Sequence, residues 1–148
     1  MSLDDTDKKI VGLLWENGRA TNNDIAKKLS ISEGTVRNRI KKLESSGFMK
    51  ISGLINPDKV PDKQLVFLGI KVALSKDLAA TAEKIAKLNN VKSVYISTGR
   101  YDIVVEAWVD VKYGLINFLS GSLASITGIV STESFLIMKS FNRWLPGF

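Results

Sequence analysis

Three segments in the N-terminal third of the chain carry apolar residues at helical spacing, which predicts three short helices. Their expected buried faces comprise Ile10, Leu13 and Leu14; Ile25, Ala26 and Leu29; and Val36, Ile40 and Leu43. Asp4 or Asp5 is the expected N-cap of the first helix. We expect Asn17-Gly18 to end that helix as a left-handed C-cap.

Polar residues mark the ends of the second and third helices. Thr21 or Asn22 is expected to begin the second helix, and Ser32 to cap the third. Gly47 is expected to close the third helix. Two helices of about 8 and 13 residues, separated by a three-residue turn, are typical of a helix-turn-helix.

The remaining two-thirds of the chain alternates between strand and helix patterns. We expect strands over residues 65–74, 91–98, 101–109 and 130–142, and helices over residues 77–88 and 112–126. This βαββαβ order predicts an α+β, ferredoxin-like sheet with both helices on one face. The expected domains are therefore a helix-turn-helix domain at 1–52, a linker at 53–63 and the ferredoxin-like domain at 64–148.

Several strands of this sheet are apolar on both faces. In the first strand Val66 and Leu68 occupy one face, while Leu65 and Phe67 occupy the other. A strand with this pattern is buried on both faces, and a chain this short has no second layer to cover the sheet. We therefore expect self-association through the sheet, with the tail Trp144–Phe148 packed at a subunit contact.

The composition of the 148 residues excludes much catalytic chemistry. The chain has no Cys and no His, so thiol nucleophiles, imidazole bases and the usual zinc ligands are absent. We expect no enzyme, no metal site and no cofactor. Charges interrupt every apolar run before it could span a bilayer, and Asp4, Asp5 and Asp7 have the wrong sign for a secretory signal. The expected location is the cytoplasm, with no membrane partner.

The net charge of +6 is distributed unevenly along the chain. Residues 27–50 hold seven basic side chains against Glu33 and Glu44, a net of +5, and this segment includes the third helix. A basic patch of this kind predicts a polyanionic partner. The alternative is that the basic helix is simply a solvated surface.

The outer face of the third helix has the side chains that bind DNA. A helix fits the major groove, where Arg can bind guanine and Asn can bind adenine through two hydrogen bonds. Arg37 and Asn38 are the expected base readers, followed by Thr35, because residues near the start of such a helix reach deepest. Residues expected to contact the DNA backbone or to support the helix start are Thr21, Asn22, Asn23, Ser32, Gly34, Arg39, Lys41 and Lys42. Gly34 would allow close approach to a phosphate.

Sequence motifs along nearly the whole chain resemble those of the leucine-responsive regulatory protein/AsnC family of transcription regulators. These motifs are LDDTDKKI (3–10), NGRAT (17–21), DIAKKL (24–29), VRNRIKKLE (36–44), INP (55–57) and GRYD (99–102). The resemblance implies a winged-type helix-turn-helix followed by a ferredoxin-like RAM (ACT-like) domain. It also implies homodimers that often assemble into octamers. Two recognition helices of a dimer would then read a pseudo-palindromic site in double-stranded DNA.

The resemblance also implies a small-molecule effector, commonly an amino acid, near the loop Gly99, Arg100, Tyr101 and Asp102. The carboxylate of Asp102 can pair with an α-ammonium group, and the backbone amides around Gly99 can bind an α-carboxylate. Thr132 and Ser134 are the expected polar neighbours. The alternative is that this loop is only a hairpin turn in which Asp102 bonds its own backbone.

Two segments depart from the family pattern. Phe48–Ile55 is about one residue short and lacks a tyrosine often found there, and Arg143–Phe148 has no recognisable counterpart.

Two other functions compete with transcription regulation. One competing function is a metabolite-sensing or interaction module that does not bind a specific DNA site. The other is an enzyme similar to the siroheme decarboxylases, which share this architecture but depend on a histidine that this chain lacks.

Overall fold

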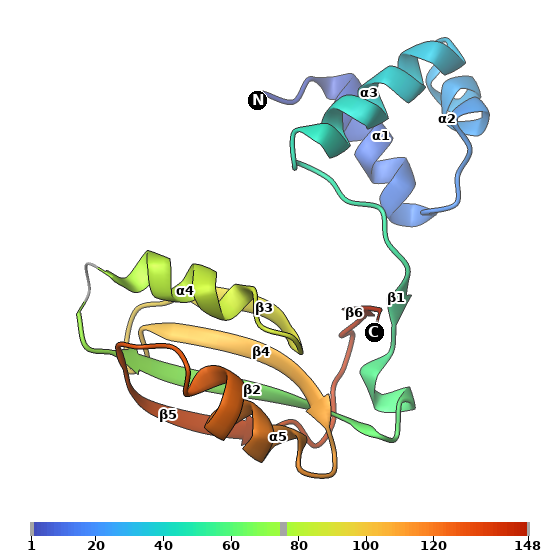
Figure 1. Ribbon diagram of the computed structural model, residues 1–148. Coiled ribbons are helices and arrows are strands. Elements are labelled where there is room, and N and C mark those ends of the chain that lie inside the picture. Colours follow the sequence, from blue (N-terminus) through green and yellow to red (C-terminus); the bar gives the residue numbers. More distant parts are fainter. Residues whose placement is uncertain (1, 75–76, 148) are drawn as a thin grey trace. The chain divides into compact units, whose positions relative to one another are not determined.

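The computed structural model describes residues 2–74 and 77–147 of the chain (Figure 1). The chain folds as two compact units, Met1–Ser52 and Gly53–Phe148. The first unit is built from helices, and the second from a four-stranded antiparallel sheet with helices on it. Within the described ranges, no helix has both the length and the apolar character needed to cross a membrane.

The first unit contains the three predicted helices: α1 (Asp5–Glu16), α2 (Asn22–Leu29) and α3 (Glu33–Ser45) (Figure 1). Each helix begins at a side chain that accepts a hydrogen bond from a backbone amide three residues later. These N-caps are Asp4, Thr21 and Ser32. The predicted cap residues are therefore confirmed.

The predicted apolar stripes form the core of the first unit. Ile10 and Leu14 of α1, Ile25 of α2 and Val36 of α3 are buried together, and Ile40 packs against them.

The predicted left-handed C-cap at the end of α1 is wrong. Asn17 has an extended backbone (φ −145°), and Gly18 does not have positive φ; instead, its short turn continues to Ala20, whose amide donates to the Asn17 carbonyl.

The left-handed positions of this unit lie elsewhere. Ser30 (φ 54°) forms the turn between α2 and α3. Gly47 (φ 71°) follows α3, as predicted, and the amides of Phe48 and Met49 then donate to the carbonyl of Leu43. Residues 46–52 contain no strand, so the winged part of this fold has no β-hairpin within residues 2–52.

The second unit has the predicted βαββαβ order. Its sheet consists of β2 (Lys63–Val72), β3 (Val91–Ile96), β4 (Ile103–Asp110) and β5 (Ile129–Leu136), all antiparallel, in the spatial order β3-β4-β2-β5. The helices α4 (Leu78–Ala86) and α5 (Gly114–Asn117) cover one face of this sheet (Figure 1). This arrangement is the ferredoxin-like fold.

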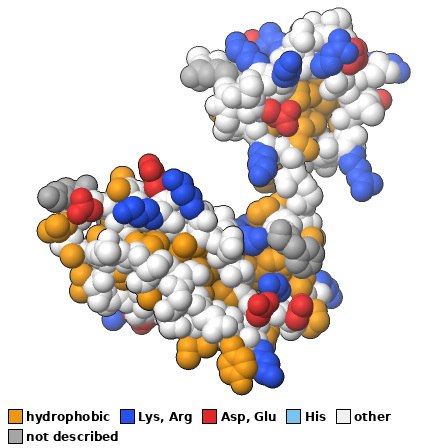
Figure 2. Space-filling model, viewed as in Figure 1, with side chains coloured by type: hydrophobic (Ala, Val, Ile, Leu, Met, Phe, Trp, Pro, Cys, Tyr) orange, Lys and Arg blue, Asp and Glu red, His pale blue; other side chains and the backbone are white. Residues whose placement is uncertain are grey.

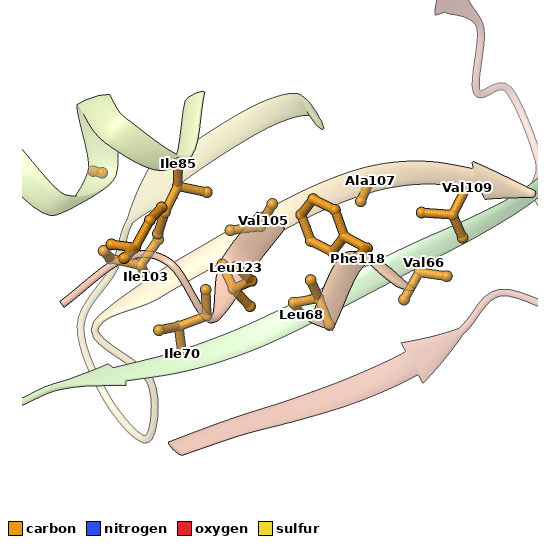
Figure 3. Close-up of a cluster of buried hydrophobic side chains, with 12 residues drawn as sticks. Val66, Leu68, Ile70, Ile85, Ile103, Val105, Ala107, Val109, Phe118 and Leu123 are labelled. Carbon is orange, nitrogen blue, oxygen red and sulfur yellow. The ribbon is translucent and has the colours of Figure 1, made fainter. Parts of the chain in front are cut away.

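The core of the second unit lies between the sheet and these helices (Figure 3). Alternate residues of β2 and β4 point into it, because successive side chains of a strand face opposite sides. Ile85 of α4 closes one end of this core, and Phe118 and Leu123 cover it after α5. The buried strand residues are Val66, Leu68, Ile70, Ile103, Val105, Ala107 and Val109.

The second predicted helix is broken. It was expected over 112–126, but α5 has only four residues and continues as a π-helical turn, η3 (Phe118–Leu123). Gly121 and its serine neighbours are poor helix formers, and the hydroxyl of Ser120 donates to the carbonyl of Ile116 at 2.7 Å. The wider turn still buries both Phe118 and Leu123.

The last predicted strand is shorter than expected: β5 ends at Leu136. The tail beyond it packs Leu145 on the face of the sheet opposite the helices. The two-residue strand β6 (Leu145–Pro146) pairs with β1 (Leu54–Ile55). β1 lies within residues 53–63, which were expected to be a linker. A 3-10 turn, η1 (Pro57–Lys59), follows β1. Leu145 is fully buried with Leu65 and Trp108.

This path corrects the prediction for the tail and for part of the sheet. Of the tail Trp144–Phe148, expected at a subunit contact, Leu145 belongs to the core of its own chain, whereas Trp144 is half exposed and its expected contact stays a prediction. The side chain of Arg143 also binds the buried carboxylate of Glu106 on β4. The chain itself therefore covers part of the face for which a second copy seemed the simplest cover. Phe148 lies outside the described residues.

Candidate nucleic-acid interface and effector loop

The outer face of α3 carries most of the side chains predicted to bind DNA. Val36 and Leu43 are fully buried on the inner face, so the residues between them turn outward. The exposed side chains on this helix include the predicted DNA-binding residues Thr35, Arg37, Asn38, Lys41 and Lys42, with Glu44 and Ser45 in the last turn. Figure 2 shows several Lys and Arg side chains over the first unit on the face in view. Together they form a basic surface with hydrogen-bonding groups suited to both bases and phosphates.

The N-terminal ends of α2 and α3 are held by local hydrogen bonds. The hydroxyl of Thr21 donates to the carboxylate of Asp24 at 2.7 Å, which lowers the pKa of Asp24. The hydroxyls of Ser32 and Thr35 share a hydrogen bond of 2.7 Å. Asn23, in the first turn of α2, is exposed. These bonds fix the helix starts, where free backbone amides favour a phosphate.

Gly34 lies in the first turn of α3 and makes no demanding contact within the protein. A Cβ added there would meet only the Nη2 atom of Arg37, at 3.8 Å. Packing within this chain therefore does not require glycine at this position. The open space is consistent with the close approach to a phosphate that the sequence suggested.

Arg39 differs from the other predicted DNA-binding residues. Its Nη1 atom donates to Asp4 at 2.6 Å and to Asp7 at 2.7 Å, which ties α3 to the start of α1. The backbone amide of Asp7, together with Arg39, holds the pKa of Asp4 below its ordinary value. These two bonds hold the Arg39 guanidinium against α1, so Arg39 has a structural role in the first unit.

Glu33 contacts two of the predicted DNA-binding residues, although the sequence analysis did not place it among them. Its Oε2 atom lies 3.4 Å from Nη1 of Arg37, and its Oε1 atom accepts from Nδ2 of Asn22 at 3.4 Å. It thus connects a predicted base reader with the start of α2. The i, i+4 spacing of Glu33 and Arg37 was a signal for the first contact, whereas Asn22 is 11 residues away.

The predicted effector loop forms a tight connection between β3 and β4. Gly99 has φ 107°, a value that favours glycine. Both the amide and the hydroxyl of Ser97 donate across the loop, to the carbonyls of Asp102 and Tyr101. One carboxylate oxygen of Asp102 accepts from the amide of Val72 at 2.9 Å. Asp102 therefore ties the loop to β2 instead of bonding only within its own turn.

The aromatic ring of Tyr101 lies against the sheet face opposite the helices. A Cβ on Gly69 would be only 2.6 Å from this ring, so glycine is required there. The ring also meets Phe135 edge-on, with 6.3 Å between centroids. Arg100 extends into solvent, and its Nη2 atom is 3.5 Å from Glu133 on β5.

The structure does not bring Thr132 and Ser134 to the same face as this loop. Thr132 is opposite Ile70 and Ser134 is opposite Leu68, and both partners point toward the helices. Glu133 is opposite Gly69, on the side where Tyr101 packs. Since paired residues share a face, the polar neighbour of the loop is Glu133.

The fold and these surfaces define a helix-turn-helix DNA-binding unit joined to a ligand-binding α+β unit. Residues 3–48 match the winged helix-turn-helix DNA-binding family, and residues 65–143 match the Lrp/AsnC ligand binding domain. The chain belongs to the Lrp/AsnC family and is a transcriptional regulator. The predicted family and fold class are thus confirmed.

Three similar proteins illustrate the relationship. An HTH-type transcriptional regulator of Pyrococcus furiosus is 38% identical over 143 residues, covering 96% of this chain and 95% of the relative. The HTH-type transcriptional regulator FL11 of Pyrococcus abyssi is 33% identical over 141 residues, covering 95% and 92%. A Neisseria meningitidis transcriptional regulator, solved in complex with L-Met, has a TM-score of 0.76 at 27% identity and covers 96% and 94%.

Proposed function

We propose that this regulator binds a specific, pseudo-palindromic site in double-stranded DNA through α3, with Arg37 and Asn38 reading bases. The single observation that carries this proposal is the outward basic face of α3 next to the capped start of α2. Thr35, Lys41 and Lys42 would supply further contacts, with Thr21, Asn22, Asn23, Ser32 and Gly34 along the DNA backbone. Arg39 does not belong to this set, because its guanidinium is held by α1.

We further propose that the working form is a homodimer or a larger oligomer, such as an octamer. Part of the sheet face opposite the helices is not covered by the tail: Tyr95 and Phe135 there are about half exposed. Pairing would place two copies of α3 on successive half-sites, about one helical turn apart. Analytical ultracentrifugation would measure the oligomeric state, and a stable monomer would contradict the proposal.

The effector we propose is an amino acid or a related small molecule. Support comes from the match to a ligand-binding domain and from the L-Met complex of the Neisseria relative. The candidate contacts are Asp102 and the backbone around Gly99, with Arg100 and Tyr101 beside them. Thr132 and Ser134 lie on the face of the sheet opposite that of Glu133, so they are weaker candidates for effector contacts. We propose that the protein is a regulator without catalytic activity and acts in the cytoplasm. Residues 1–52 would bind DNA, and residues 64–148 would mediate self-association and bind the effector.

The test is a selection of bound sequences from random duplex DNA, run with and without pooled amino acids. We expect one enriched motif with two-fold symmetry, and an affinity that falls as salt rises, with a log–log slope of about −0.9 per phosphate contact. Arg37→Ala should weaken binding to this motif by about 1–3 kcal/mol. Lys87→Ala removes the same charge from an exposed position of the other unit, outside the proposed DNA and effector contacts, and serves as the control.

Three results would count against this function. Failure to enrich any motif would favour a sensing or interaction module without specific DNA binding. An equal loss on motif and random DNA would make Arg37 a phosphate contact instead of a base reader. An unchanged motif and affinity across the amino-acid pools would contradict the proposed effector class.

A further inference from the structure

The proposed recognition helix carries one acidic side chain at the end expected to reach deepest into the groove. Glu33 is the first residue of α3, whereas the other acid of this helix, Glu44, lies in its last turn. A carboxylate near DNA repels the phosphates. The helix dipole favours an acid at this end, which would by itself explain Glu33 without any role in recognition.

The contacts of Glu33 suggest more than a dipole effect. Its two carboxylate oxygens contact different partners: Oε1 accepts from Asn22 and Oε2 faces Arg37, each at 3.4 Å. Both distances are long, and the side chain of Arg37 is 63% exposed. A surface ion pair at i, i+4 is weak. When DNA is bound, one base can therefore take the place of Arg37 as the partner of Glu33, and another base can take the place of Glu33 as the partner of Arg37.

The two side chains have opposite hydrogen-bonding capacity in the major groove. A carboxylate only accepts hydrogen bonds, and it therefore suits the N4 amino group of cytosine. The same carboxylate is repelled by the O6 and N7 acceptors of guanine and the O4 acceptor of thymine. A guanidinium only donates and suits guanine. Side chains four residues apart on a helix are neighbours, so the two address the same or adjacent base pairs.

We propose that Glu33 determines base specificity, accepting a hydrogen bond from the N4 amino group of a cytosine next to the guanine bound by Arg37. This inference rests on the proposed function. Glu33 selects as much by repulsion as by attraction, because guanine and thymine at this position would place acceptors against its carboxylate.

The experiment compares sequence selection by the wild-type chain, Glu33→Gln and Glu44→Gln. Arg37→Ala first identifies the guanine read by Arg37. We expect the wild type to prefer cytosine at a base pair adjacent to this guanine. Glu33→Gln should lose about tenfold of this preference and shift it toward adenine, because an amide can both donate to and accept from adenine.

Glu44→Gln is a matched control, since it removes the same charge from the same helix. Any general gain in affinity from weaker phosphate repulsion is shared by the two variants, but the change of base preference is expected only for Glu33→Gln. Glu33→Asp keeps the acceptor and should keep cytosine, so it tests the proposal even if Glu33→Gln folds poorly.

Separate outcomes overturn the inference and the function beneath it. If Glu33→Gln folds, as judged by circular dichroism, and selects the wild-type motif with undiminished discrimination, Glu33 is not a specificity determinant. Glu33 also loses this role if Glu33→Gln and Glu44→Gln gain affinity equally and show no change of motif. If the wild type itself selects no motif, the proposed function fails, and this inference with it.

Discussion

The pair between Arg143 and Glu106 should stabilise the second unit more than any surface ion pair of this protein. Glu106 lies on β4 with 1% of its surface exposed, and it receives two hydrogen bonds from Arg143, one of them 2.7 Å from Nε to Oε1. The Glu106 carboxylate raises the pKa of Arg143. Arg143→Ala would leave a buried carboxylate without its partner.

The expected magnitude follows from this burial. Breaking a buried pair by removing one partner destabilises a protein by about 3–5 kcal/mol, whereas an exposed pair contributes about 0–1 kcal/mol. Because the Arg143 side chain is partly exposed, water can reach the site and we expect a loss near the lower value. Arg143 also leads into β6, so loosening it should weaken the packing of Leu145 as well.

Urea unfolding followed by tryptophan fluorescence would measure this loss at a fixed protein concentration. Trp108 is buried in the second unit and should report its unfolding, whereas Trp15 in the first unit is 90% exposed and should change little. Arg100→Ala breaks an exposed pair in the same unit and is the control. If Arg143→Ala loses no more stability than this control, burial of Glu106 does not make the pair important.

Two further predictions concern single contacts. Asp4 has a lowered pKa in the folded state, so its contribution to stability is present above the unfolded pKa, about 4, and is lost as pH falls through the folded value. Acid unfolding of the first unit should therefore depend less on pH in Asp4→Asn, and an unchanged pH profile would contradict this. Gly69→Ala should destabilise the second unit by about 1–3 kcal/mol, because its Cβ would overlap the ring of Tyr101. Gly121→Ala, where a Cβ meets nothing within 4 Å, is the control in the same urea experiment.

Most of the elements of this fold could be predicted because their signals are local. A cap such as Ser32 and the amide that it binds are three residues apart, and an apolar stripe repeats within one helix. The basic face of α3 follows from the same periodicity, since burial of Val36 and Leu43 turns Arg37 and Asn38 outward. The caps, the apolar stripes and the basic face of α3 could therefore be predicted from residues that are close together in the sequence.

The predictions that the structure contradicts concern segments where local sequence signals compete, or where they do not indicate which distant residues pack together. Asn17-Gly18 has the composition of a left-handed cap, yet the chain turns there with an extended Asn17. The helix expected over 112–126 has a sound apolar stripe, but its glycine and serine residues allow a π turn. Thr132 and Ser134 were chosen for their polarity, and a strand's facing cannot be read from polarity when both faces are partly apolar.

The order of helices and strands, the class of fold and the basic outer face of α3 follow from the 148 residues as written, because those features depend on positions a few residues apart. Which distant charges meet emerges only in the folded chain. Folding joins Arg39 to Asp4 across 35 positions and Arg143 to Glu106 across 37, and it pairs β6 with β1 from opposite ends of the second unit. Such pairings depend on strand register and chain path, which are set by packing of the whole unit and leave no periodic trace in the order of residues.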